Sequence, residues 1–118
     1  MLKKLSILTL GLTALSSMPA MAYTCTNASY YGISDGFHGR ITANGQRFDA
    51  YGLTAAHPSM PFGTRLRVTD QNSGRSVIVK INDRGPYVAG RSLDLSYGAF
   101  SRIASPSQGV ARVCYSRV

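Results

Sequence analysis

The sequence contains no glutamate, so its side-chain carboxyl groups belong to five aspartates. Any acid–base chemistry by a carboxyl group must therefore rest on one of these positions. Asp83 is the first candidate, because it follows an alternating apolar run that ends at Ile81 and stands in the turn-forming segment 82–86. The complete set is Asp35, Asp49, Asp70, Asp83 and Asp94.

Histidine and cysteine are also scarce, with two of each in the chain. His38 and His57 do not form a His-x-x-x-His pair, and the cysteines do not form a Cys-x-x-Cys pair. The spacings typical of metal sites are thus missing, and so is a glycine-rich phosphate loop. We therefore predict no metal and no other cofactor, and we expect neither nucleotide nor acyl-transfer chemistry.

The sequence has no apolar run long enough to cross a membrane, which takes about 20 residues. The run from Leu5 to Leu15 is shorter and is interrupted by serine, threonine and glycine. Two lysines precede it, and the small residues of Pro19 to Ala22 resemble a cleavage site. This pattern predicts a secretory signal peptide at 1–22 and an exported mature domain at 23–118, without a membrane span.

Cys25 lies close to the predicted cleavage point, a position that lipoproteins use for lipid attachment. The residues before it lack the leucine and the small residue expected there, so we do not predict a lipid anchor. Cys25 and Cys114 instead bracket almost the whole mature domain in an oxidising compartment. We predict a disulfide between them; the alternative is a pair of buried, unpaired thiols. A loop of this length contributes about 4 to 5 kcal/mol on the chain-entropy model.

The charge balance is strongly basic. Without the lysines at 3 and 4, the predicted mature chain has 11 basic and five acidic residues, a formal charge of +6. This charge favours an anionic partner such as a cell-wall polymer, a lipid headgroup or lipopolysaccharide. The arginines are spread evenly along the chain rather than gathered in one segment, so we do not predict nucleic-acid binding.

Most of the mature chain has the alternation of β-strands. A hairpin is predicted from 65–69 and 76–81 around the turn 71–74, with further strands at 24–31, 93–95 and 110–115. Ser96 is a candidate N-cap for a short helix that runs to Ile103 and stops before Pro106. These elements predict one small, mainly β barrel with one or two short helices.

The segment 39–62 is rich in turn formers and has no clear period, so we predict a long ordered loop. Its polar side chains could bind sugar hydroxyl groups, but from these residues alone local turns and packing are the favoured explanation. These candidates are Thr42, Asn44, Gln46, Asp49 and His57.

Short segments spread over 28–115 follow a recognisable order and spacing. They include Ala28 to Gly32, Thr42 to Gly45, Leu53 to His57, Asn82 to Pro86 and Asp94 to Ser96. In these segments the chain resembles the double-psi β-barrel domain of the rare lipoprotein A family, the septal lytic transglycosylases of bacterial peptidoglycan. Expansins and barwin-like proteins are more distant relatives. The resemblance implies a monomeric six-stranded double-psi barrel that binds peptidoglycan glycan strands in the periplasm or cell envelope.

The resemblance also implies a reaction. The β-1,4 bond between N-acetylmuramic acid and N-acetylglucosamine is cleaved without water, and attack by the muramic C6 hydroxyl leaves a 1,6-anhydro end. One acid can protonate the departing oxygen and then, as its conjugate base, remove the C6 hydroxyl proton. Asp83 matches the catalytic aspartate of the family, and the end of an apolar strand would bury it in part.

Asp49 and His57 match further active-site positions, for which we predict substrate orientation and electrostatic support. Gln46 departs from the family, because many active relatives have glutamate there; an amide can hydrogen-bond sugar but cannot exchange a proton near neutral pH. We interpret Asp94 as a buried, hydrogen-bonded strut and assign no role to Asp35 or Asp70.

The alternative function is a non-catalytic, expansin-like module that binds wall polysaccharide. Aromatic rings would stack on sugars while arginines hold anionic polymer. Core packing is the competing explanation for these rings, which belong to Tyr30, Tyr31, Tyr51, Phe62 and Tyr87.

Overall fold

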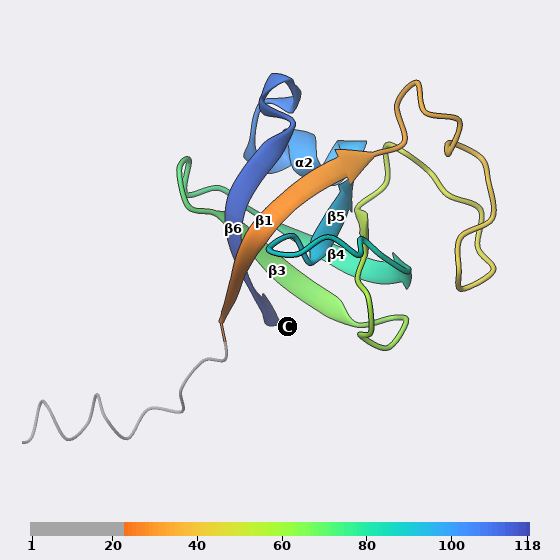
Figure 1. Ribbon diagram of the computed structural model, residues 1–118, viewed down its shortest axis with the longest axis horizontal. Helices are drawn as coiled ribbons and strands as arrows, with labels where there is room; N and C mark the ends of the chain where they lie inside the picture. The colour runs from red at the N-terminus through yellow and green to blue at the C-terminus, as the bar shows by residue number, and fades with distance from the viewer. Residues whose placement is uncertain (1–22) are drawn as a thin grey trace, which may run out of the picture.

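The structure is a computed structural model that describes residues 23–118. The predicted signal peptide, residues 1–22, lies outside the described residues. Six strands close into a barrel, accompanied by one α-helix, α2 (Tyr97–Ile103), and a 3-10 turn, η1 (Pro106–Gln108), within the described part (Figure 1). The strands are β1 (Thr24–Tyr31), β2 (Thr54–Ala56), β3 (Arg65–Asp70), β4 (Ser76–Asp83), β5 (Leu93–Ser96) and β6 (Val110–Arg117).

The strands follow the order β1-β5-β2-β4-β3-β6 around the barrel. β1 and β5 are parallel, as are β2 and β4, whereas the other neighbours are antiparallel. Closure leaves no free sheet edge among these strands. The predicted mainly β barrel with a short helix is confirmed.

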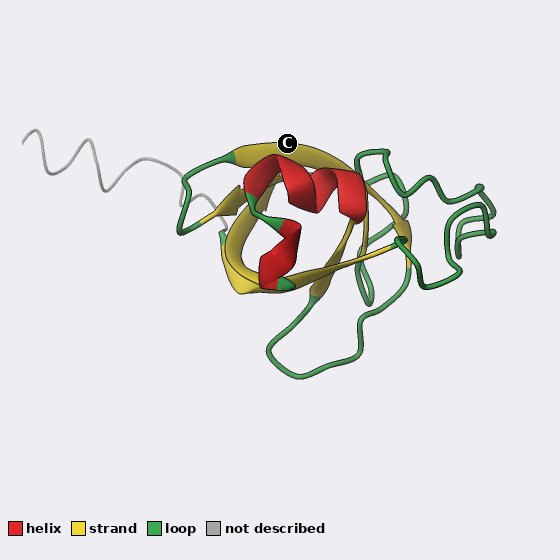
Figure 2. Cartoon of the chain, turned by 90° about the horizontal axis from the view of Figure 1, so that it is seen from above, coloured by secondary structure: helices red, strands yellow, loops and turns green. Residues whose placement is uncertain are grey.

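The core fills the barrel with inward-facing side chains of alternate strand positions. In β3, for example, Leu66 and Val68 are fully buried, whereas Arg65 and Arg67 face solvent. Phe100 and Ile103 of α2 add to this core from one end of the ring of strands, where the helix lies across it (Figure 2). Burying apolar surface in this way supplies the main stabilising free energy of the domain.

Ser96 caps α2 as predicted. Its hydroxyl accepts a hydrogen bond from the backbone N–H of Ala99 at 3.2 Å and donates one to the carbonyl of Gly52 at 2.6 Å. The helix also approaches the loop before β2 so closely that a Cβ at Gly98 would lie 2.6 Å from the carbonyl oxygen of Tyr51. The helix start and the 50–52 segment are therefore fixed together. The helix ends at Ile103, and Pro106 opens η1 instead of stopping α2 directly.

The predicted hairpin is present as β3 and β4, with Leu66 opposite Val79 and Val68 opposite Val77. The prediction of one loop over 39–62 is wrong in one place, because Thr54 to Ala56 form β2. Three residues are too few to show an alternation in sequence. The strand exists because β4 and β5 supply hydrogen-bonding partners on both of its sides.

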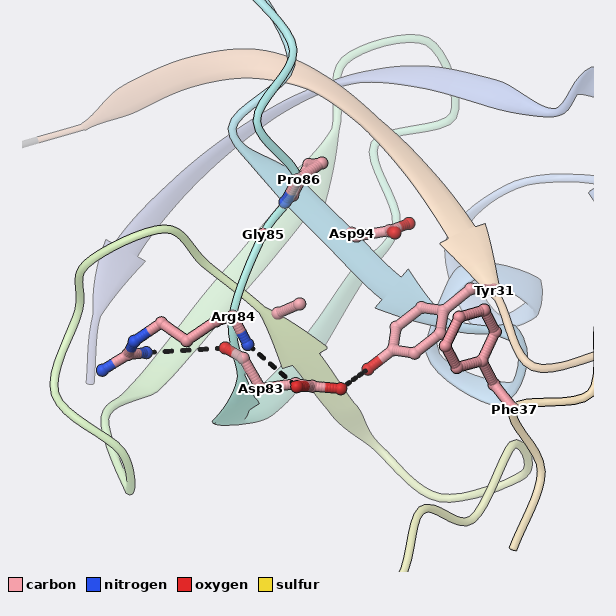
Figure 3. Close-up of a pocket in the computed structure, with 8 residues that line it drawn as sticks. Tyr31, Phe37, Asp83, Arg84, Gly85, Pro86 and Asp94 are labelled. Atoms are coloured by element: carbon pink, nitrogen blue, oxygen red, sulfur yellow. Dashed lines mark hydrogen bonds between the residues drawn. The ribbon is translucent and has the colours of Figure 1, made fainter. Parts of the chain in front are cut away.

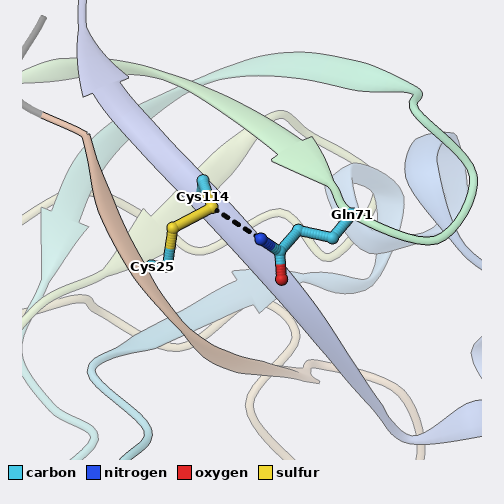
Figure 4. Close-up of a disulfide and its surroundings, with 3 residues drawn as sticks. All are labelled: Cys25, Gln71 and Cys114. Carbon is cyan, nitrogen blue, oxygen red and sulfur yellow. Dashed lines mark hydrogen bonds between the residues drawn. A yellow bond between two sulfur atoms is a disulfide. The ribbon is translucent and has the colours of Figure 1, made fainter.

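Cys25 and Cys114 form the predicted disulfide (Figure 4). They are directly opposite in the antiparallel ladder of β1 and β6, so the bond joins two neighbouring strands that are 89 residues apart in sequence. Gln71 donates a hydrogen bond to the Cys114 sulfur at 3.1 Å. No helix in the described part of the chain has the length and apolar character needed to span a membrane.

Candidate active site

Asp83 is the last residue of β4, where that strand leaves the barrel. Its Oδ1 accepts hydrogen bonds from the backbone N–H groups of Ala43 at 3.0 Å and Arg84 at 2.9 Å. Its Oδ2 accepts one from the Tyr31 hydroxyl at 3.1 Å (Figure 3). All three partners are donors, so they fit an ionised carboxylate, which can only accept.

Tyr31 ends β1 and is held by other aromatic rings. It stacks on Phe48 at a centroid distance of 4.6 Å and meets Phe37 edge to face at 5.8 Å. Burial raises the pKa of Tyr31, and the adjacent Asp83 charge raises it further. The phenol therefore keeps its proton and donates to Asp83. Gly32 allows this packing, because a Cβ there would lie 2.6 Å from the Phe48 ring.

Asp83 lines a pocket of about 200 Å³ that also contains Asp94. The two aspartates stand on either side of one residue, since Ala56 of β2 pairs with Asp83 of β4 and with Asp94 of β5. Two strand spacings place their backbones roughly 10 Å apart, and the small Ala56 side chain leaves space between them. The pocket is completed by Tyr31, Phe37, Arg84, Gly85 and Pro86.

Asp94 is more than the strut that the sequence suggested. Ser29 donates a hydrogen bond to its Oδ1 at 2.8 Å, which is the structural role expected. The side chain nevertheless points away from the core residues Leu93 and Leu95 and reaches the pocket. Burial raises the pKa of Asp94, with the Ser29 hydrogen bond and Arg91 acting in the opposite direction.

The turn 42–46 lies beside Asp83 mainly through its backbone. Besides the Ala43 contact, the Asn44 N–H donates to the Asn82 carbonyl at 3.3 Å. The Thr42 hydroxyl and Asn44 amide bond each other and also hold the backbone of Gln46. The Gln46 side chain is exposed. Thr42 and Asn44 therefore shape the turn, and the turn supplies the N–H group that orients Asp83.

His57 lies next to Asp83 through its backbone N–H, which donates to the Asp83 carbonyl at 3.2 Å. Its Nδ1 accepts from the backbone N–H groups of Ser59 and Met60, at 3.1 and 3.0 Å, and its Nε2 is 3.4 Å from the Tyr115 hydroxyl. Burial lowers the pKa of His57, as do Arg84 and Arg117. The ring is thus a neutral tautomer whose basic nitrogen is already occupied, so it supports the loop rather than taking a proton.

Asp49 does not line the pocket around Asp83. Its Oδ1 accepts from the backbone N–H of Tyr51 at 2.9 Å, which is the local turn contact foreseen as an alternative. Asp35 and Asp70 hold turns in the same manner, through the N–H groups of Gly32 and Ser73 respectively.

Arg84 follows Asp83, but its guanidinium turns away from the Tyr31 side of the pocket (Figure 3). The guanidinium carbon lies 3.9 Å from the centre of the Phe62 ring. This cation–π contact keeps a positive charge at the rim, beside an exposed aromatic ring. Phe37, Tyr51 and Tyr87 are also exposed.

The segment Gly32 to Gly36 matches Gly-x-Ser-x-Gly, the sequence motif of a nucleophile elbow. Ser34 has a positive φ of 58° and follows a strand, but the segment after it is a loop and not a helix. Neither described histidine ring hydrogen-bonds Ser34, since the Nδ1 atoms accept from Ala50 in one case and from Ser59 and Met60 in the other. The segment lacks the context of an acyl-transfer site.

Sequence reasoning did not place Tyr31 and Asp94 in one pocket with Asp83. Two signals in the sequence pointed to Asp94: its segment belongs to the family resemblance, and its place between two leucines of a strand points it away from the core. Nothing in the sequence paired Tyr31 with Asp83, because the two residues are 52 positions apart.

The fold defines a class of small β-barrel proteins: six strands close into a barrel, two strand pairs are parallel, and a pocket with two carboxyl groups lies at the strand ends. Solved structures share this fold. A Streptomyces papain inhibitor aligns with a TM-score of 0.66 and 24% identity, covering 85% of this chain and 97% of its own. The apo expansin of Clavibacter michiganensis aligns with a TM-score of 0.65 and 25% identity, over 81% of this chain and 50% of its own.

Sequence comparison narrows the class. Residues 23–115 match the family model described as lytic transglycolase. A probable endolytic peptidoglycan transglycosylase RlpA from Nostoc sp. is 57% identical over 73% of this chain and 23% of its own length. The endolytic peptidoglycan transglycosylase RlpA of Pseudomonas aeruginosa is 45% identical over 88% of this chain and 30% of its own. The chain belongs to the RlpA-like double-psi β-barrel family of lytic transglycosylases, and it spans less than a third of these relatives' length.

Proposed function

We propose that this chain is an exported peptidoglycan lytic transglycosylase of the cell envelope, in which Asp83 is a general acid/base group. It would cleave the β-1,4 bond between N-acetylmuramic acid and N-acetylglucosamine and leave 1,6-anhydro ends. The observation that carries the proposal is the half-buried Asp83 carboxylate in the pocket, oriented by Ala43, Arg84 and Tyr31. The relatives named as peptidoglycan transglycosylases support the substrate class.

The pocket fits the proton transfers of this reaction. A carboxylate fixed by three donors keeps one orientation, which is what removal of the C6 hydroxyl proton needs. Water does not enter the bond-forming step, so no metal-activated or base-activated water is required. Gln46 is compatible with this chemistry, because its exposed amide can bind sugar and leaves the proton transfers to the pocket.

The experiment is digestion of purified sacculi by the 23–118 protein, with and without prior removal of stem peptides, followed by mass spectrometry of the soluble products. Wild-type protein should release anhydro-muropeptides, and Asp83→Asn should reduce their formation by about 100-fold or more. Asp70→Asn is the matched control: it also converts a carboxyl to an amide, but at the end of β3 and outside the pocket. Release of reducing-end products would instead indicate hydrolysis, which the proposal does not allow.

The exposed rings of Phe37, Tyr51, Phe62 and Tyr87 favour a second candidate, an expansin-like module that binds wall polysaccharide without cutting it. Such rings can stack on sugars. Pelleting with sacculi separates the two functions. Binding that Asp83→Asn leaves unchanged, together with no soluble product from wild type, would support the module and contradict the enzyme.

A further inference from the structure

We propose that Asp94 is a second catalytic residue of the pocket, the general acid that protonates the glycosidic oxygen while Asp83 serves as the base. This inference rests on the proposed function and divides between two carboxyl groups the work that the family resemblance gave to one. It follows from the strand register, the hydrogen bonds of each carboxyl group and the surrounding charges.

The strand register brings the carboxyl groups of Asp83 and Asp94 to one pocket. Ala56 pairs with Asp83 on one side and with Asp94 on the other, so the carboxyl groups approach the same space from two strands. A pair of carboxyl groups on either side of a glycosidic bond is the arrangement by which one can protonate the leaving oxygen and the other can act on the attacking group. Figure 3 shows Asp94 on the Tyr31 side of the pocket, with Arg84 extending to the opposite side.

The hydrogen bonds give the two groups different tasks. Both oxygens of Asp83 accept from donors, so a proton on Asp83 would displace Tyr31 or a backbone N–H group. Asp94 accepts at Oδ1 alone among the hydrogen bonds of residues 23–118, from Ser29. Its other oxygen has room for a proton that it can donate to a bound sugar.

The charges around Asp94 support the same division. The titratable and charged side chains that face it are Tyr31, Asp35, Asp83, Arg84 and Arg91. Tyr31 is neutral, and the Arg84 guanidinium is held over Phe62. Burial raises the pKa of Asp94; the Ser29 hydrogen bond and Arg91 oppose this rise, and the charges of Asp35 and Asp83 reinforce it.

The proposed step balances. The muramic O6 attacks C1, the C1–O4 bond breaks, and a C1–O6 bond forms. The O6 proton passes to Asp83, and the Asp94 proton passes to the departing O4 of N-acetylglucosamine. When the products leave, Asp83 returns its proton to solvent and Asp94 takes one up, so no water is consumed and no other reactant is required.

The dependence of the reaction rate on the leaving group tests the role of Asp94 as the general acid. A nitrophenyl glycoside of N-acetylmuramic acid with a free C6 hydroxyl has a leaving group that needs no proton. Asp94→Asn should therefore lose about 100-fold or more on sacculi while it keeps most of the wild-type rate on the nitrophenyl substrate. Asp83→Asn should lose activity on both, because the C6 hydroxyl still needs its base.

Ser29→Ala gives a milder test if Asp94→Asn folds poorly. The Ser29 hydrogen bond lowers the pKa of Asp94, so its removal should shift the alkaline limb of the pH–rate profile on sacculi to higher pH. Wild-type turnover that Asp94→Asn leaves unchanged, or an equal loss on both substrates, would overturn the role of Asp94 alone. Absence of anhydro products from wild type would overturn the proposed function and this inference with it.

Discussion

The two ends of strand β1 show how differently one barrel can be held. At its beginning, Cys25 pairs with Cys114 and the β1–β6 ladder continues through Ser29 and Val110. At its end, Tyr31 lies beyond the β1–β6 ladder; its backbone pairs with Ser96 of β5, and its side chain is fixed by aromatic contacts and by Asp83. Regular ladders and a covalent bond stabilise the first end. At the second end the β1–β5 ladder holds the backbone, and single contacts of loops and side chains position the Tyr31 ring. This end is where the chemistry is proposed.

In this fold the residues that stabilise the barrel and the residues proposed to react lie at different ends of β1. The disulfide end contributes to the free energy of unfolding and has no residue in the pocket. The pocket end contains the carboxyl groups of Asp83 and Asp94, and burial raises the pKa of Asp94. Substitutions at the two ends should therefore affect different measurements.

Removal of the disulfide is expected to have the largest effect. Cys25→Ser with Cys114→Ser frees a long loop in the unfolded chain and should lower the free energy of unfolding by about 4 to 5 kcal/mol. Urea unfolding measures this change, and the rate of anhydro-product release per folded molecule should stay at the wild-type value. A selective loss of activity with unchanged stability would contradict the separation of the two ends.

Filling the space between the two aspartates is expected to have the next largest effect. Ala56→Leu places a larger side chain between Asp83 and Asp94, and displacement of a bound glycan by even 1 Å can cost about 100-fold in rate. Activity on sacculi should fall with side-chain volume through a series of Gly, Ser and Leu at this position. Equal rates for Gly and Leu would show that the glycan does not enter this space.

Tyr31→Phe should reduce activity by about 10- to 100-fold. The substitution keeps the stacking on Phe48 but removes the donor to Asp83, and a hydrogen bond to a charged group contributes about 1.5 to 3 kcal/mol. Tyr30→Phe is the matched control, because its hydroxyl donates to the Pro106 carbonyl away from the pocket. If both variants lose activity to the same extent, the Tyr31 hydroxyl has no particular role.

Substitution of His57 should have the smallest effect, and it should change the free energy of unfolding rather than the reaction rate. The lowered pKa of folded His57 means that the unfolded chain binds a proton first as pH falls. The neutral His57 ring therefore contributes fully to the free energy of unfolding above pH 6.5, the ordinary pKa of histidine. This contribution is lost as pH falls through the pKa of the folded state. His57→Asn, which keeps an acceptor near Ser59 and Met60, should lessen the fall in stability between about pH 8 and about pH 5. Identical pH dependence in urea unfolding would contradict this account.

Local patterns predicted much of the barrel. The hairpin of β3 and β4 shows a clear alternation, and Ser96 caps α2 through its own local contact. The disulfide was also predicted, since two cysteines in a domain that is predicted to be exported have few alternatives. β2 was not, because its three residues become a strand only between β4 and β5.

The site was predictable only in part. Asp83 stood out as a rare carboxyl group at the end of an apolar strand. We predicted that His57 orients the substrate, and this role depends on the orientation of its ring. Tertiary contacts instead direct the ring nitrogens to Tyr115 and to the backbone of residues 59–60. Asp49 was drawn into a local turn by the nearby Tyr51 N–H, a contact that sequence offered as one of two alternatives.

The sequence by itself determined that five aspartates supply all the side-chain carboxyl groups of this chain, and it predicted a β-barrel with one disulfide that would present them. Alternation and residue scarcity are local properties, which a sequence displays directly. Only the tertiary structure decided that Asp83 and Asp94 share a pocket, because their proximity depends on the parallel and antiparallel pairing of β2 with its two neighbours. Strand order around a barrel is fixed by long-range contacts, and no short segment of the chain contains it.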